Sequence, residues 1–142
     1  GVPADDVTTF LMSQYGIEMY GLAVFASARA LAEKPEAVRA FLRAYARGLK
    51  DTLREPGAAI DAMLRRGGGS SRDSDLARLL IVIRDSVVTP EVRQNGLGGV
   101  EPARLEVAID QIAIGHGFKT KPRPADVFDA ALLPPEAERR ID

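Results

Sequence analysis

The sequence predicts an α/β chain that is rich in helix, carries about two strands and forms part of a larger protein. Val7–Met12 is β-branched and apolar, and Gly21–Phe25 is apolar on both faces, so each is typical of a buried strand. From Pro35 onward, apolar residues recur at helical spacing. Because two strands alone are marginal in water, we expect their partner strands to lie outside this chain.

The helical elements are predicted from apolar spacing and from residues that start or stop helices. Pro35 suits a first helical position, Thr89 suits a cap, and Gly96 suits a helix end. Gly67–Ser71 is typical of a flexible loop between helices. The expected helices lie at residues 35–54, 56–66, 73–87, 90–96 and 102–114.

Composition limits the classes of function. The 142 residues suffice for one domain, and 46% of them are hydrophobic. A net charge of −1, from 19 basic and 20 acidic residues, gives no electrostatic reason to expect a nucleic-acid partner. The sequence has no cysteine, which excludes disulfides, thiolate metal sites and cysteine nucleophiles. No apolar run approaches the roughly 20 residues that span a bilayer.

Most residues that could carry chemistry have a simpler interpretation. His116, the only histidine, lies between two glycines at a helix end and is favoured as a cap or surface residue over a general base. Gly67–Gly69 lacks the preceding strand and the lysine of a phosphate loop, so a surface loop is favoured. Asp126 and Asp129 could pair for acid/base or metal chemistry, although local capping is favoured.

Two features leave a functional alternative open. A basic stripe, which we define as Arg39, Arg43, Arg47 and Lys50, follows one face of the helix predicted at 35–54; a solvated face is favoured over the docking of an acidic partner. Tyr15 and Tyr20 flank a glycine-containing segment just before the second predicted strand. Tyrosine suits a cleft wall that stacks on a small ring, and interface packing explains these positions about equally well.

The order of these motifs resembles the C-terminal half of ABC-transporter substrate-binding proteins, most closely the nitrate/sulfonate/taurine and thiamine-pyrimidine branch. No single motif is specific, but the ordered set extends over nearly the whole chain. The motifs are Tyr15–Gly21 with the run to Ser27, Lys34–Phe41, Pro56–Ile60, Thr89–Val92, Asn95–Gly98, Asp126–Asp129 and Leu132–Pro134.

The resemblance implies part of a type II periplasmic-binding fold, in which a ligand is held between two lobes. Residues 1–27 would form the crossover strands and hinge region, residues 28–125 the helical part of lobe I, and residues 126–142 a C-terminal segment that packs across the lobes. Tyr15 and Tyr20 would lie at the ligand cleft or hinge. No catalytic residue, metal ligand or cofactor is implied.

The function that the resemblance implies is solute binding for an ABC importer, without enzymatic activity. The ligand would be a small anion, a sulfonate or a pyrimidine-like molecule, and the protein partner would be the membrane permease. Such a protein would be periplasmic, or extracytoplasmic and tethered to the membrane. A fragment with an unpaired strand edge is also expected to self-associate. The alternatives are a thiamine-pathway pyrimidine synthase and a helical protein-interaction module that uses the basic stripe.

Overall fold

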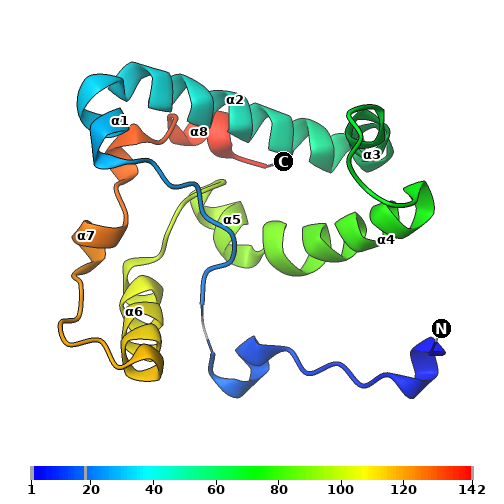
Figure 1. Ribbon diagram of the computed structural model, residues 1–142, viewed down its shortest axis with the longest axis horizontal. Helices are drawn as coiled ribbons and strands as arrows, with labels where there is room; N and C mark the ends of the chain where they lie inside the picture. Colours follow the sequence, from blue (N-terminus) through cyan, green and yellow to red (C-terminus); the bar gives the residue numbers. More distant parts are fainter. Residues whose placement is uncertain (1, 18, 142) are drawn as a thin grey trace. The chain divides into compact units, whose positions relative to one another are not determined.

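The computed structural model describes residues 2–17 and 19–141 (Figure 1). Contacts divide the chain into two compact units. The smaller unit combines Gly1–Ala23 with Glu101–Phe128, and the larger unit combines Val24–Val100 with Asp129–Asp142. The chain crosses between the units after Ala23, Val100 and Phe128. The predicted division was at residues 27 and 125. The assignment of those predicted segments to lobes stays a prediction.

The predicted α/β class is wrong: helices make up 65% of the structure, and residues 2–17 and 19–141 contain no strand. Residues 7–11 and 21–25 belong to no helix, and Met12 begins a 3₁₀-helix, η2 (Met12–Tyr15). A strand needs a neighbour to accept and donate its backbone hydrogen bonds. Residues 21–25 make no backbone hydrogen bond within the described chain.

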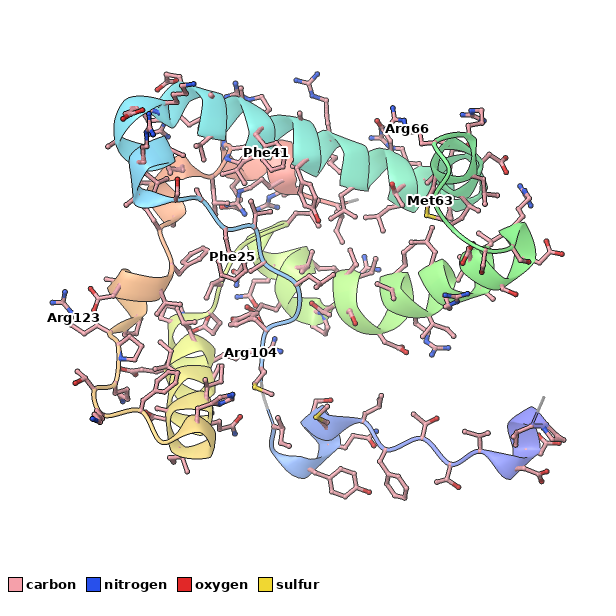
Figure 2. The ribbon with its side chains drawn as sticks, viewed as in Figure 1. Phe25, Phe41, Met63, Arg66, Arg104 and Arg123 are labelled. Atoms are coloured by element: carbon pink, nitrogen blue, oxygen red, sulfur yellow. The ribbon has the colours of Figure 1, made fainter. Side chains whose placement is uncertain are left out.

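The apolar side chains of the two predicted strands lie in solvent instead of in a core. Phe10 is 68% exposed, and Phe25, which projects from the chain in Figure 2, is 92% exposed. Leu22 is fully exposed. The residue types that favour a strand are therefore present, but the structure provides no sheet to cover them.

In the larger unit, helices begin where the sequence offers a cap or a proline. Ser27 Oγ accepts the N–H of Ala30 at 3.1 Å, and Thr89 Oγ1 accepts the N–H of Val92 at 3.2 Å. Proline occupies the first position of α2, α3 and α5. The elements are α1 (Ala28–Glu33), α2 (Pro35–Arg54), α3 (Pro56–Arg65), α4 (Arg72–Val82), the π-helix η3 (Ile83–Val87) and α5 (Pro90–Asn95). The helices predicted at 35–54, 56–66 and 90–96 are confirmed, and the one at 73–87 changes to π geometry after Val82.

The C-terminal segment, residues 129–141, completes the larger unit. It contains the 3₁₀-helix η4 (Ala130–Leu132) and α8 (Glu136–Arg139), and both lie alongside α2 (Figure 1). Among the described residues of this unit, few apolar ones are buried: Ala46, Ile60, Leu97 and Pro134. Polar contacts must therefore contribute much of the order at this end of the chain.

The smaller unit is built around α6 (Pro102–His116), which contacts α7 (Pro124–Val127). The sequence predicted the α6 helix, and its end is set by Gly117, whose φ of 61° is accessible to glycine without strain. Ala108 and Ile109 on α6 are buried. The N-terminal part of this unit holds η1 (Ala4–Asp6) and η2. None of the described helices in either unit has the length and apolarity that crossing a membrane requires.

The turn between α3 and α4 is organised by a buried carboxylate. The side chain of Asp75 is 8% exposed and accepts the N–H groups of Ser70 at 2.7 Å and Ser71 at 3.1 Å. Arg78 lies 3.2 Å away. These hydrogen bonds, with the nearby Arg78 charge, hold the pKa of Asp75 below its usual value.

Replacing Asp75 with asparagine is expected to make stability less dependent on pH. Because its pKa is lower in the folded state, the carboxylate stabilises the fold above its unfolded pKa, and this contribution is lost as pH falls through the folded value. The difference in unfolding free energy between wild type and Asp75→Asn should hold steady from neutral pH downward and shrink below about pH 4. Urea denaturation at several pH values measures it; a difference that stays constant into acid would contradict this role.

Candidate functional site

Tyr20 is held in place by the N-terminal end of α6. Its hydroxyl oxygen accepts the N–H of Glu101 at 2.9 Å, at the residue that caps the helix. The guanidinium carbon of Arg104 lies 4.5 Å from the centre of the Tyr20 ring, a cation–π geometry. Arg104 also donates to the carbonyl of Met19 at 3.2 Å. The half-buried Tyr20 side chain is thus fixed by a hydrogen bond at its tip and a cation on its face.

Tyr15 is arranged differently. Its side chain is 65% exposed, and its ring lies 6.0 Å from that of Phe10 at an angle of 56°. Gly16, the next residue, accepts a hydrogen bond at its carbonyl from Gln111 of α6 at 2.7 Å. Glu18, in the same motif, lies outside the described residues. That Tyr15 and Tyr20 bind a ligand stays a prediction; the structure fixes one and leaves the other accessible.

Removing the Tyr20 hydroxyl should destabilise the smaller unit, whereas removing the Tyr15 hydroxyl should not. Tyr20→Phe leaves the Glu101 N–H without its 2.9 Å acceptor, which should cost about 1 kcal/mol of unfolding free energy. Tyr15→Phe is the matched control because that side chain is exposed. Urea denaturation measures the unfolding free energy of the two variants. Equal stabilities would show that the hydrogen bond to Glu101 contributes nothing.

The C-terminal segment contacts three of the four residues of the basic stripe. Arg39 donates to the carbonyl of Ala131, and Arg43 forms an ion pair with Glu138 at 2.8 Å. Lys50 approaches the Glu138 carbonyl at 3.4 Å. Arg43 and Arg47 are exposed, whereas Arg39 and Lys50 are half-buried, so the solvated-face interpretation fits the stripe only in part.

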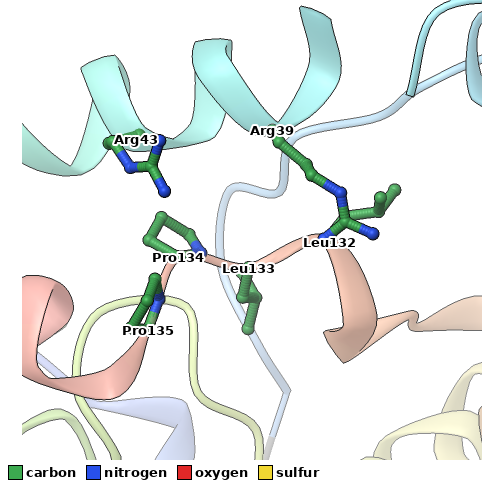
Figure 3. A pocket seen from close by; sticks show the side chains of 6 residues that line it. All are labelled: Arg39, Arg43, Leu132, Leu133, Pro134 and Pro135. Carbon is green, nitrogen blue, oxygen red and sulfur yellow. The ribbon is translucent and has the colours of Figure 1, made fainter. Parts of the chain in front are cut away.

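A pocket of about 340 Å³ remains between α2 and the C-terminal segment (Figure 3). We call it the arginine pocket, and its lining comprises Arg39, Arg43, Leu132, Leu133, Pro134 and Pro135. It combines two cations with an apolar wall, a composition that suits an anionic group with an apolar body. A wider groove of about 940 Å³ lies between α2 and α3, where charged residues such as Asp51, Arg54 and Arg66 accompany small apolar ones.

The C-terminal segment is tied to the larger unit by Arg139, whose importance the sequence did not indicate. Its guanidinium donates to the carbonyls of Pro134 at 2.8 Å, Asn95 at 3.0 Å and Leu97 at 2.8 Å. The N–H of Leu97 in turn donates to the Arg139 carbonyl at 2.9 Å. Gly96 permits this approach, since a Cβ there would lie 3.2 Å from the Arg139 Cβ. The sequence around Arg139 carries no pattern that would reveal such partners.

The remaining sequence candidates have local structural partners. His116 places its Nδ1 3.2 Å from the Ile112 carbonyl, one turn earlier on α6. Asp126 accepts from the side chain and backbone of Arg123, which lowers the pKa of Asp126 to about 2. Asp129 accepts the N–H of Ala131 at 2.8 Å. The capping interpretation of both aspartates is confirmed.

The glycine-rich loop and the acidic residues do not build an ion site in the described part of the chain. The N–H groups after Gly69 donate to the chain's own Asp75, so the surface-loop interpretation is favoured over phosphate binding. Among residues 2–17 and 19–141, no group of three or more histidine, cysteine, aspartate or glutamate side chains is arranged to hold a metal ion.

A family model described as NMT1/THI5 like matches residues 3–59. No curated protein and no solved structure matches the chain. The matched stretch includes Tyr15–Gly21 and Lys34–Phe41, two of the motifs that carry the resemblance. This family comprises ABC-transporter substrate-binding proteins for nitrate and sulfonate together with THI5 synthases. The comparison therefore supports the family resemblance over residues 3–59, which are similar to NMT1/THI5-like proteins.

Proposed function

We propose that this chain belongs to the solute-binding component of an ABC importer and binds a small anion, a sulfonate or a pyrimidine-like molecule without converting it. The observation that carries the proposal is the NMT1/THI5-like match over residues 3–59, which supports a solute-binding or THI5-like role. Binding proteins of importers work outside the cytoplasm and deliver their ligand to a membrane permease. An extracytoplasmic location and a permease partner accordingly form part of the proposal.

Tyr15 and Tyr20 are the ligand contacts in this proposal. Both lie within the matched residues, and the two differ in a useful way. Arg104 and the Glu101 N–H already hold Tyr20, so it can support a site without moving. The exposed Tyr15 ring is free to stack on a planar ligand. Tyr15→Ala should therefore weaken binding of a ring-containing ligand more than that of nitrate.

The proposal is tested by titrating nitrate, taurine and a hydroxymethylpyrimidine into the protein expressed from its whole coding sequence. We expect saturable heat with one of the three, and recovery of that compound unchanged after prolonged incubation. Nitrate is a simple anion, whereas taurine carries a sulfonate and an ammonium group, so a preference between them reports both the charge and the shape that the site accepts. Saturable binding of none of the three would overturn the proposal.

The competing function is that of a THI5-like synthase, which the same family match favours equally. The two differ in the fate of the small molecule. Iron-dependent formation of a pyrimidine product, abolished by His116→Ala, would establish the enzyme and replace the binding proposal. The interaction-module alternative is less favoured, because the C-terminal segment contacts Arg39, Arg43 and Lys50 of the basic stripe.

Self-association follows from the apolar side chains that the N-terminal part leaves in solvent. Phe10, Met12, Leu22 and Phe25 are each more than 60% exposed. Large apolar side chains left in solvent favour association. We expect sedimentation equilibrium of this 142-residue chain to show a concentration-dependent increase in mass, which Phe25→Ser combined with Leu22→Ser should reduce. A strictly monomeric chain at high concentration would contradict this expectation.

A further inference from the structure

Arg43 in the arginine pocket uses only part of its hydrogen-bonding capacity. Its Nε donates to Glu138 Oε2 at 2.8 Å, and its two terminal nitrogens donate to no group in residues 2–17 and 19–141. The side chain is 47% exposed. A guanidinium presents paired N–H groups in a planar fork that matches a carboxylate. Arg43 therefore retains donors for a second, external acceptor.

Arg39 brings a second cation to the same pocket. It lies four residues before Arg43, and residues at that spacing are neighbours on one helix face. Figure 3 shows both side chains extending from α2 toward the Leu132–Pro135 segment. Arg39 is positioned by its hydrogen bond to the Ala131 carbonyl, and Glu36 lies 3.5 Å from its Nε.

The wall opposite the arginines is apolar. Leu132, Leu133, Pro134 and Pro135 line it. Its two prolines have no backbone N–H that could bind the ligand in place of the arginines. The Pro134 carbonyl already accepts a hydrogen bond from Arg139. A volume of about 340 Å³ suits a molecule of a few heavy atoms. Arg43 already donates to the carboxylate of Glu138, so a carboxylate is a suitable partner for this arginine.

We propose that the arginine pocket is a binding site for a small organic carboxylate, whose carboxylate group binds the fork of Arg43 beside Arg39 and whose apolar body lies against Leu132–Pro134. The site is independent of the proposed importer function, and neither Tyr15 nor Tyr20 lines it. Glu138 takes only the Nε of Arg43, but its negative charge opposes that of the ligand, so the affinity of the pocket depends on that internal carboxylate as well as on the two cations.

The probe is isobutyrate, titrated into the ¹⁵N-labelled chain while the amide resonances of Ala131–Leu133 are followed. Isobutyramide, which has the same shape without charge, and inorganic sulfate, which has charge without an apolar body, are the comparison compounds. We expect saturable shifts with isobutyrate and much weaker ones with the other two. Arg43→Gln should weaken isobutyrate binding about tenfold, since it removes a charge-assisted pair of hydrogen bonds.

Two further variants separate binding from general charge or folding. Arg47→Gln removes the same charge from the same helix outside the pocket and should leave the affinity unchanged. Glu138→Gln removes the competing carboxylate and should strengthen binding about threefold. Dispersed amide spectra establish that each variant is folded, and Arg43→Lys, which keeps the charge but loses the fork, should also weaken binding.

Three results would overturn the carboxylate site. The first is the absence of a saturable shift with isobutyrate, and the second is binding of isobutyramide or sulfate as tight as that of isobutyrate. Equal effects of Arg43→Gln and Arg47→Gln would likewise assign the shifts to nonspecific electrostatics. An increase in affinity on Glu138→Gln is the result that a purely structural ion pair would not give.

Discussion

Replacing Gly69 with alanine is expected to lower the free energy of unfolding of the larger unit by about 2–4 kcal/mol. The residue has a φ of 79°, a region that residues with a Cβ adopt at a cost. An added Cβ would also lie 2.6 Å from Asp75 Oδ2 and 2.7 Å from Met63 Cε. Either the loop moves and releases Asp75 from the Ser70 and Ser71 amides, or Met63 leaves its position.

Gly67 provides the matched control for this substitution. It has nearly the same φ, 77°, but a Cβ there would meet nothing within 4 Å. Gly67→Ala should therefore show only the conformational cost, about 1 kcal/mol. Urea denaturation followed by circular dichroism compares the two variants. If they lose the same stability, the close packing of Gly69 against Asp75 and Met63 is not what stabilises the turn.

Arg139→Met is expected to have a comparable effect at the other end of the larger unit, about 2–4 kcal/mol. The substitution keeps an apolar stem but removes the guanidinium that donates to three carbonyls, on Pro134, Asn95 and Leu97. Pro134 and Leu97 are buried, so water can replace the lost donor only in part. The C-terminal segment would lose its link to α5 and, with it, much of its hold on α2.

Arg140 is the control for Arg139, because it is adjacent, carries the same charge and is exposed. Within residues 2–17 and 19–141, its guanidinium pairs only with Glu136 at the start of α8, at 2.6 Å. Arg140→Met should change stability by less than about 0.5 kcal/mol. Hydrogen exchange adds a local readout, since the Leu97 amide donates to the Arg139 carbonyl and should lose protection in Arg139→Met alone. Equal behaviour of the two variants would contradict the role of Arg139.

Local sequence signals predicted the helices because the information for them lies within each segment. Pro35 at a first position and an apolar stripe determine α2, and Pro102 with Gly117 bounds α6. The strands failed for the opposite reason. Val7–Met12 and Gly21–Phe25 have strand-forming residues, but a strand exists only when a partner accepts its hydrogen bonds, and that condition is not local.

The candidate site was accessible to sequence reasoning only in part. The sequence indicates Tyr15 and Tyr20 because they flank a glycine-containing segment, yet the surroundings of Tyr20 depend on Glu101 and Arg104, more than 80 positions away. The basic stripe was visible as a pattern on one helix face, but its cover comes from Ala131 and Glu138, about 90 positions later. Contacts over such distances depend on chain topology, which periodicity does not report.

The most direct test of the proposed role is calorimetric titration of the protein from its whole coding sequence with nitrate, taurine and a hydroxymethylpyrimidine under one buffer condition. We expect a saturable isotherm for one of these solutes, weakened by Tyr20→Ala, with the solute recovered intact. No saturable isotherm with any of the three, or conversion of the bound solute into a product, would contradict it.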